Sequence, residues 1–189
     1  MRCTQSNTGR SDLRAFTLVE LLLALVICSL VTASVVAMMV AVSYGTSSSR
    51  DLRSLVVKSR TIDARLSAAV RGSRSVLASG TDFLILWTGD NNADDTTDNA
   101  EVRLIERDPA TDELNSYYDT AAAGVYADAT TFRNAAKSSY TYQRWGTGVN
   151  AITFVPDVAP PGTKLVSYDF TLENAEVSET VVGAAAVRN

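Results

Sequence analysis

The sequence predicts an α+β protein in which one long N-terminal helix packs on a small antiparallel β-sheet. Residues 16–44 form an apolar run that is almost free of charge, and residues 52–70 repeat apolar side chains at helical spacing. From about residue 78 onward, apolar side chains instead alternate with polar ones, as in half-buried strands. We therefore divide the chain into a basic leader (1–15), a transmembrane helix (16–44), an amphipathic helical stem (45–77) and a β-rich head (78–189).

The apolar run of residues 16–44 is long enough to cross a membrane, because about 20 helical residues span the hydrocarbon core. The preceding leader carries three arginines and one aspartate, and positively charged segments tend to stay in the cytoplasm. We expect a single-pass protein of the cytoplasmic (inner) membrane, with a cytoplasmic N-terminus and an extracytoplasmic head, in the periplasm or at the cell surface. The run contains no proline, so its helix should be unbroken.

The stem begins with a Gly-Thr-Ser-Ser-Ser segment at residues 45–49, which has the composition of a linker and read alone would end the helix. An apolar stripe at helical spacing resumes directly after it. The stripe consists of Leu52, Leu55, Val56, Ile62, Leu66, Ala69 and Val70. The helix therefore either continues through the serines or kinks there.

The head is predicted to contain six strands and one short helix. The first three strands follow one another closely and should form an antiparallel meander on which the stem can pack. The predicted strands cover residues 82–88, 101–107, 113–118, 149–155, 164–172 and 176–182, and the helix covers residues 130–137. Residues 145–148 are typical of a turn and residues 183–186 of a loose tail, and the pattern leaves open whether the strands form one sheet or two.

Composition argues against an enzyme. The chain has no histidine, which removes the usual general base, nucleophile activator and transition-metal ligand. It also lacks a Ser/His/Asp set, a phosphate-binding glycine loop and the spacing of zinc ligands. Its two cysteines, Cys3 and Cys28, lie in the leader and in the apolar run, so the head cannot form an internal disulfide.

Charge is distributed unevenly along the chain. Residues 50–74 carry seven basic and two acidic side chains, whereas residues 82–189 carry seven basic and 17 acidic ones. These opposite signs favour contacts between stem and head, within one subunit or between subunits. The alternative is a solvated basic face of the helix. The acidic head argues against nucleic acid as a partner, because phosphate contacts need clustered lysine and arginine.

Glu20 lies inside the apolar run, where an ionised carboxylate costs a few kcal/mol and should have a partner. The residues from Arg14 to Glu20 read Arg-Ala-Phe-Thr-Leu-Val-Glu. This pattern resembles the processing signal of type IV prepilins and type II secretion pseudopilins. The resemblance implies cleavage between Ala15 and Phe16 by a prepilin peptidase/methyltransferase, which also methylates the Phe16 amine, and makes Glu20 the fifth residue of the mature chain. Ala15 stands where the family usually has glycine.

The same resemblance implies a pilin-like fold and a structural function. In this family one long helix is both anchor and stem, which favours a continuous helix from about Phe16 to about Ser75 with a weak point at residues 45–49. The chain would be a minor pilin or pseudopilin, a subunit of a type II secretion pseudopilus or type IV pilus-like filament. Its partners would be other pilin or pseudopilin subunits and an inner-membrane assembly platform. The Glu20 carboxylate would pair with the Phe16 amine of a neighbouring subunit.

Three other interpretations use the same residues. An ordinary secretory signal would be cut after Ala33 or Ala37, although the apolar run continues past both. A generic membrane anchor would tolerate Glu20 near the membrane edge and leave the bond between Ala15 and Phe16 intact. A membrane-anchored binding module outside the cytoplasm would capture an exported substrate or DNA without polymerising.

An acidic segment after the first predicted strand has oxygen ligands at the spacing of a calcium loop. Asp90, Asn92, Asp94, Thr96, Asp98 and Glu101 occupy places 1, 3, 5, 7, 9 and 12 of a twelve-residue stretch. Calcium is therefore the one cofactor that the sequence suggests. The sixth place holds Asp95, where calcium loops have glycine, and the flanking segments are predicted strands rather than helices. The alternative is a solvated hairpin loop.

Overall fold

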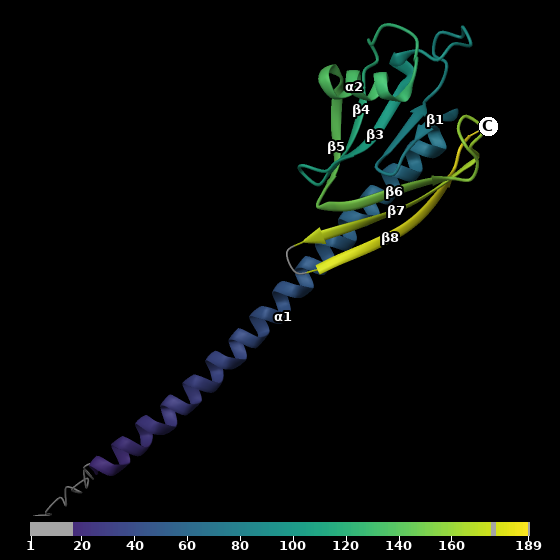
Figure 1. Ribbon diagram of the computed structural model, residues 1–189. Helices are drawn as coiled ribbons and strands as arrows, with labels where there is room; N and C mark the ends of the chain where they lie inside the picture. The colour runs from purple at the N-terminus through teal and green to yellow at the C-terminus, as the bar shows by residue number, and fades with distance from the viewer. Residues whose placement is uncertain (1–16, 175–176, 189) are drawn as a thin grey trace, which may run out of the picture. The chain divides into compact units, whose positions relative to one another are not determined.

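The computed structural model describes residues 17–174 and 177–188 of the chain (Figure 1). The chain divides into two compact units, with the boundary between Ser48 and Ser49. The described part of the first unit is almost entirely helical, and the second contains the end of the same helix, two antiparallel sheets and a shorter helix. The predicted combination of a long N-terminal helix with antiparallel strands is thus confirmed, and the fold is an α+β mixture.

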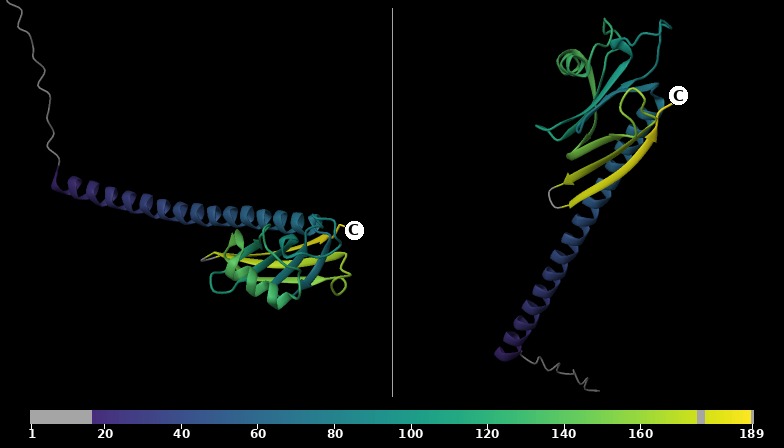
Figure 2. Two further views of the ribbon diagram at one scale, coloured as in Figure 1. Left: turned by 90° about the horizontal axis from the view of Figure 1, so that it is seen from above. Right: turned by 45° about the vertical axis from the view of Figure 1, so that its right-hand side comes forward.

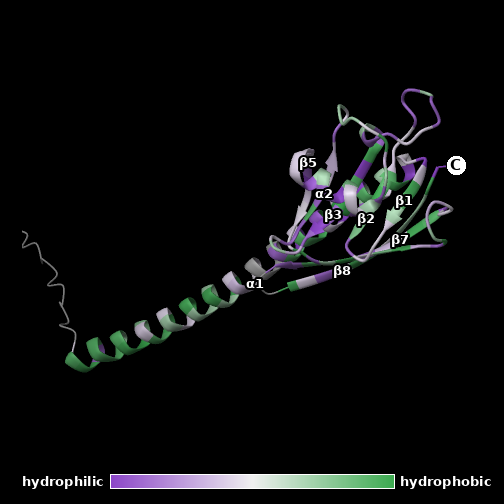
Figure 3. Ribbon diagram, turned by 45° about the horizontal axis from the view of Figure 1, so that its top comes forward, coloured by the Kyte–Doolittle hydropathy of each residue, from purple (hydrophilic) through white to green (hydrophobic). Residues whose placement is uncertain are grey.

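Helix α1 (Leu18–Gly72) comprises 55 residues. Its N-terminal part is mostly hydrophobic (Figure 3), and among the described residues α1 is the one helix long and apolar enough to span a membrane. Hydroxyl groups in this part bond back to the preceding turn: Ser29 Oγ donates to Val26 O at 2.7 Å, and Ser34 Oγ to Leu30 O at 3.0 Å. These bonds satisfy polar groups that apolar surroundings would otherwise leave unpaired.

The helix continues through residues 45–49, where the sequence predicts a weak point. A single glycine costs a helix interior only about 1 kcal/mol relative to alanine, and Thr46 Oγ1 bonds back to the carbonyl of Val42. The predicted start at Phe16 lies outside the described residues. The helix ends at Gly72, slightly before the predicted end, because Ser75 already pairs with a neighbouring strand.

The second unit contains two antiparallel sheets (Figures 1 and 2). The five-stranded sheet has the order β1-β2-β3-β4-β5 and the three-stranded sheet the order β6-β7-β8. The first sheet comprises β1 (Ser75–Ser79), β2 (Phe83–Trp87), β3 (Val102–Asp108), β4 (Glu113–Tyr118) and β5 (Thr141–Thr147). The second comprises β6 (Val149–Pro156), β7 (Leu165–Asn174) and β8 (Val177–Ala186). The connections contain η1 (Asn99–Glu101) and α2 (Ala129–Ser139).

The predicted meander is confirmed as β2, β3 and β4, in which Leu104 pairs with Ile85 on one side and Tyr117 on the other. Helix α2 contains the predicted residues 130–137. The predicted turn at residues 145–148 is wrong for its first three residues, which lie in β5 because β4 binds this segment as far as Thr147. The expected loose tail is also wrong, because β7 provides a hydrogen-bonding partner for β8 up to Ala186. Strand β1 was not predicted.

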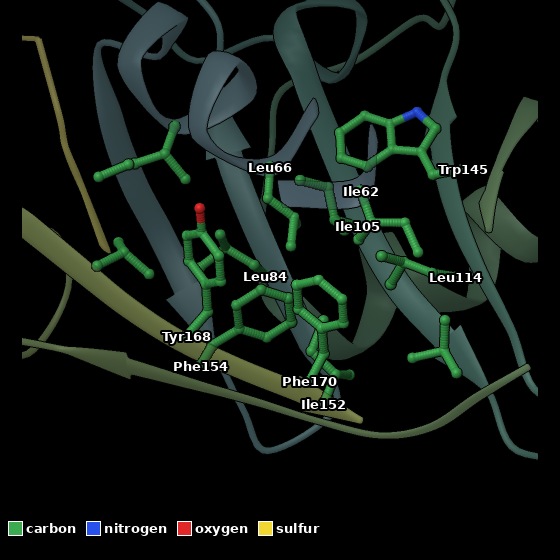
Figure 4. Close-up of a cluster of buried hydrophobic side chains, with 14 of the residues drawn as sticks. Ile62, Leu66, Leu84, Ile105, Leu114, Trp145, Ile152, Phe154, Tyr168 and Phe170 are labelled. Atoms are coloured by element: carbon green, nitrogen blue, oxygen red, sulfur yellow. The ribbon is translucent and has the colours of Figure 1, made fainter. Parts of the chain in front are cut away.

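The C-terminal part of α1, residues 51–72, packs on both sheets through part of the predicted apolar stripe, whereas the predicted members Leu52 and Val56 are exposed. Four of its side chains are at most 2 % exposed: Leu55, Ile62, Leu66 and Val70. In Figure 4, Leu66 and Ile62 face a cluster of buried side chains from both sheets, which includes Leu84, Ile105, Leu114, Ile152, Phe154, Tyr168 and Phe170. Each buried aliphatic or aromatic side chain stabilises the fold by about 1.5–3 kcal/mol. The stripe therefore accounts for the attachment of this part of α1 to the head.

A hydrogen bond from the core fixes the position of α1 over the three-stranded sheet. The Tyr168 hydroxyl donates to Asp63 Oδ1 at 2.6 Å, and Gly183 allows the close approach. A Cβ atom at Gly183 would lie 2.5 Å from Tyr168 Cε2 and 2.8 Å from Asp63 Oδ1. Burial, together with the neighbouring Asp63 carboxylate, raises the pKa of the Tyr168 hydroxyl.

Candidate functional site

The first candidate site is the beginning of α1, where Glu20 forms a capping box with Thr17. Thr17 directly precedes the first helical residue and therefore occupies the N-cap position, and Glu20 occupies the third helical position. The Glu20 backbone N–H donates to Thr17 Oγ1 at 3.3 Å. In return, the Thr17 backbone N–H and hydroxyl each donate to Glu20 Oε2 at 3.1 Å. This reciprocal arrangement satisfies two donors that the first turn of a helix otherwise leaves unpaired.

Only one oxygen of the Glu20 carboxylate takes part in the capping box. In the described part of the chain, no donor bonds to the other oxygen, Oε1. The surrounding side chains are large, apolar and exposed, with Leu18 77 % and Leu21 60 % accessible. The helix thus presents a half-satisfied carboxylate at the start of an apolar surface, a position where a donor from another molecule could bind it.

Ala15 and Phe16, the predicted cleavage and methylation site, lie outside the described residues. The capping box places the helix start at Leu18, two positions after Phe16. The role of Thr17 was missed in the sequence interpretation, although the Thr-x-x-Glu spacing is itself a signal for a helix N-terminus. The same residues therefore carry two overlapping patterns, one for the helix start and one for the resemblance to prepilins.

The second candidate site is the acidic loop between β2 and β3, which the sequence predicts as a calcium loop. Its side chains mainly bind the loop backbone. Asp90 accepts from the backbone N–H groups of Asp94, at 3.2 Å, and Asp95, at 3.1 Å. Asp94 accepts from the backbone N–H and the hydroxyl of Thr96 at 2.8 and 2.7 Å. These bonds from Thr96 lower the pKa of the Asp94 carboxyl.

The remaining three predicted ligands, Asn92, Asp98 and Glu101, do not complete a cation site. Asn92 Nδ2 donates to Asp94 Oδ2 and Asp98 Oδ2, both at 2.9 Å, so this amide presents a donor to the carboxylates. Glu101 is only 3 % exposed and accepts from Trp87 Nε1 at 3.1 Å. Its other oxygen accepts from the backbone of the loop.

A guanidinium group lies where the carboxylates of this loop converge. The Arg74 side chain lies 3.6 Å from Asp90 Oδ2 and 3.7 Å from Asp95 Oδ1, and its guanidinium carbon lies 4.5 Å from the centroid of the Trp87 ring. Among the described residues, no group of three or more Asp, Glu, His or Cys side chains is placed to hold a metal ion. The loop is thus organised by Arg74 and by its own backbone. Sequence reasoning missed Arg74, which is separated from the loop by two strands, β1 and β2, and has no local motif.

A third charged group lies beneath α2 and has a structural explanation. Glu106 on β3 is 3 % exposed and binds Lys137 Nζ at 2.6 Å and the Arg133 guanidinium through the same oxygen. The Arg133 guanidinium carbon lies 3.8 Å from the centroid of the Phe83 ring. These contacts hold α2 on the five-stranded sheet.

Comparisons of the chain with protein-family models, with curated proteins and with solved structures found no match. Of the candidate sites, the acidic loop is closed by partners from the same chain. In the Glu106 cluster, Arg133 and Lys137 bind one carboxylate oxygen, whereas Glu106 Oε2 is buried without a hydrogen-bond partner among the described residues. The Glu20 carboxylate keeps one oxygen without a donor among the described residues.

Proposed function

We propose that this chain is a minor pilin or pseudopilin, a structural subunit of a type II secretion pseudopilus or type IV pilus-like filament. In this proposal, a prepilin peptidase/methyltransferase cleaves between Ala15 and Phe16 and methylates the new amine. Residues 16–44 hold the subunit in the cytoplasmic membrane with its head outside, and an inner-membrane platform adds it to a filament of related subunits. The sequence pattern around Glu20 and the long apolar N-terminal helix support this proposal.

The observation that carries the proposal is the half-satisfied Glu20 carboxylate at the start of an apolar, exposed helix. A charge in such surroundings costs a few kcal/mol in a membrane. The hydrogen bonds from Thr17 come from neutral groups, so they do not neutralise the charge of the Glu20 carboxylate. A Phe16 amine of a neighbouring subunit would supply the missing positive charge at Oε1. Because unpaired buried charges are expensive, such pairing favours association and also one axial register between subunits.

The capping box makes it possible to separate this role from helix formation. Glutamine replaces glutamate in a capping box, so Glu20→Gln should retain the helix start and remove only the charge. Thr17→Val should do the reverse, because it removes the N-cap bonds, at a cost of about 0.5–2 kcal/mol, and keeps the carboxylate. The two variants are therefore matched controls for one another.

The test compares full-length wild type, Glu20→Gln and Thr17→Val in membranes of the native host. Cross-linking followed by gel analysis gives the assembled fraction, and mass spectrometry gives the N-terminus. We expect all three to insert in the membrane and to lose residues 1–15. Glu20→Gln should lower the assembled fraction at least about tenfold, whereas Thr17→Val should assemble nearly as wild type. Equal assembly of Glu20→Gln and wild type would show that the charge has no role, as expected for a generic membrane anchor.

A further inference from the structure

The outward side of α1 in the second unit carries an apolar strip with basic edges. Val57, Thr61, Ala64 and Ala68 are exposed and line a shallow groove on this side, and we call them the outer strip. At 100° per residue, three arginines follow one edge of the strip and two further cations the other edge. The first edge consists of Arg53, Arg60 and Arg71, and the second of Lys58 and Arg65.

None of these five cations forms an ion pair with the described residues. Arg65 donates to the carbonyl oxygens of Arg144 and Trp145 at 3.3 and 3.2 Å, and Arg71 donates to Ser67. The outer strip is thus a mainly apolar, shallow groove between positive charges that have no carboxylate partner in the described part of their own chain.

The three-stranded sheet has a face that no described element covers. Its inner face packs on α1 through Tyr168 and Gly183, whereas the side chains of alternate residues point outward. We call these outward side chains the open face: Ala151, Thr153, Val155, Leu165, Ser167, Asp169, Thr171, Glu173, Ser178, Thr180, Val182, Ala184 and Ala186. The open face is built mainly from small and apolar residues and contains no basic side chain.

Two carboxylates lie on the open face. Asp169 occupies the middle strand between Thr153 of β6 and Val182 of β8, and Val182 is 79 % exposed. Asp169 has no ion pair or hydrogen bond from a side chain among the described residues, and Glu173 accepts only from Asn150 Nδ2 at 2.8 Å. The open face therefore carries the carboxylates that the five cations beside the outer strip lack within the described part of their own chain.

We infer that the outer strip of one copy docks on the open face of a second copy. The two surfaces match in charge, since the outer strip is edged by cations and the open face contains carboxylates, and most of the other side chains of both surfaces are small or apolar. They also match in length: α1 from Arg53 to Arg71 is roughly 27 Å long, and the ten-residue strands β7 and β8 are roughly 33 Å long. Within one chain α1 covers the inner face of the same sheet, so its own strip cannot reach the open face.

The charges also decide how the copies associate. Two outer strips would bring together five cations from each copy, and two open faces would bring together carboxylates, so both symmetric pairings are repulsive. When the outer strip of one copy binds the open face of another, the assembly still has one unoccupied outer strip at one end and one unoccupied open face at the other. Such contacts extend into open chains unless a rotation closes them into a ring. The inference rests on the proposed filament function and names the surfaces that the subunits use outside the membrane helix.

The test is disulfide cross-linking of the full chain in membranes of its native host. Cys3 and Cys28 are replaced by serine, and Ala64→Cys is combined with Val182→Cys in the same chain. Both substituted positions are exposed, so folding should be retained. Oxidation should give a reducible ladder of dimers, trimers and longer multimers. Each single-cysteine variant should give only background dimers, because neither surface is expected to meet its own copy.

A charge reversal tests the electrostatic part. Adding Asp169→Arg to the two-cysteine chain should reduce the ladder at least about tenfold, because it brings like charges together, and Arg60→Asp added to that chain should restore it. Asp95→Arg, in an exposed loop outside both surfaces, is the matched control and should leave the ladder unchanged.

The failures of the two proposals are distinguishable. A chain that is processed at Phe16 and assembles through Glu20, but gives no ladder from the two-cysteine variant, would overturn the docking inference and leave the filament function standing. Strong dimers from Ala64→Cys alone or from Val182→Cys alone would overturn it in favour of a symmetric pairing. A ladder from the two-cysteine variant without processing or dependence on Glu20 would support docking and refute the proposed filament function.

Discussion

Replacing Tyr168 with phenylalanine removes one hydrogen bond between the three-stranded sheet and α1 while leaving the packing of the ring in place. The hydroxyl donates to the Asp63 carboxylate at 2.6 Å, and Tyr168 is 2 % exposed. The space beside it is already close-packed, since an added Cβ atom at Gly183 would lie 2.5 Å from the Tyr168 ring. Water therefore has little room to replace the hydroxyl.

The expected loss follows from the charge of the acceptor. Hydrogen bonds to charged groups contribute about 1.5–3 kcal/mol, so the free energy of unfolding of Tyr168→Phe should fall by about that amount. Urea denaturation of the detergent-solubilised full chain, monitored by tryptophan fluorescence, measures the difference in the free energy of unfolding between the variant and the wild type. Tyr142→Phe is the matched control, because Tyr142 is 60 % exposed. Removing its hydroxyl should change the free energy of unfolding by at most about 0.5 kcal/mol.

The same hydrogen bond predicts how the free energy of unfolding changes at alkaline pH. The pKa of the Tyr168 hydroxyl is raised in the folded protein above the ordinary value of 10.0. Its contribution is therefore fully present below about pH 10 and is lost as the pH rises toward the folded pKa. Above about pH 10, the wild type should lose up to about 1.4 kcal/mol per pH unit more than Tyr168→Phe. An equal loss in both proteins, or a deficit of Tyr168→Phe below about 0.5 kcal/mol at neutral pH, would refute the reasoning.

Three further changes probe the core and the acidic loop. Leu66→Ala should lower the free energy of unfolding by about 2–5 kcal/mol, because Leu66 is fully buried, whereas Val57→Ala on the exposed side of the same helix should change it by at most about 0.5 kcal/mol. Gly146→Ala should lower the free energy of unfolding by about 1–3 kcal/mol, because the new Cβ would lie 2.4 Å from Ile62 Cδ1. Its control is Gly72→Ala, where a new Cβ would meet no atom within 4 Å. Equal melting temperatures of the two variants would contradict the packing argument. Millimolar calcium should leave the melting temperature unchanged, since Arg74 lies between the carboxylates of the loop; a rise that Asp94→Asn abolishes would establish a calcium site instead.

The regular part of the fold could be predicted from local patterns. The stripe of Leu55, Ile62 and Leu66 shows helical spacing whatever lies beside it, and the burial of these side chains follows the prediction. The strands of the meander were likewise predicted by alternation. The continuity of α1 through residues 45–49 was less certain from composition, because glycine and serine weaken a helix by amounts that the neighbouring turns can offset.

The errors have long-range causes. Gly146 reads as a turn residue, yet it lies in β5 because β4 pairs with it through Leu114. Ile62, distant in sequence, occupies the space where a side chain at this position would be. Residues 183–186 lack bulky side chains and become a strand only because β7 pairs with them. In the acidic loop, the spacing of oxygen atoms was read correctly, but a local pattern contains no information about Arg74, which reaches the loop from outside it.

The N-terminus of the chain in membranes of its native host tests the central claim most directly. Intact mass and N-terminal sequencing determine it without any substitution. The proposed function predicts a mature chain that begins at Phe16 with a methylated amine. A chain that retains Ala15, or one that begins after Ala33 or Ala37, would contradict entry into the pilin pathway and with it the proposed role of Glu20.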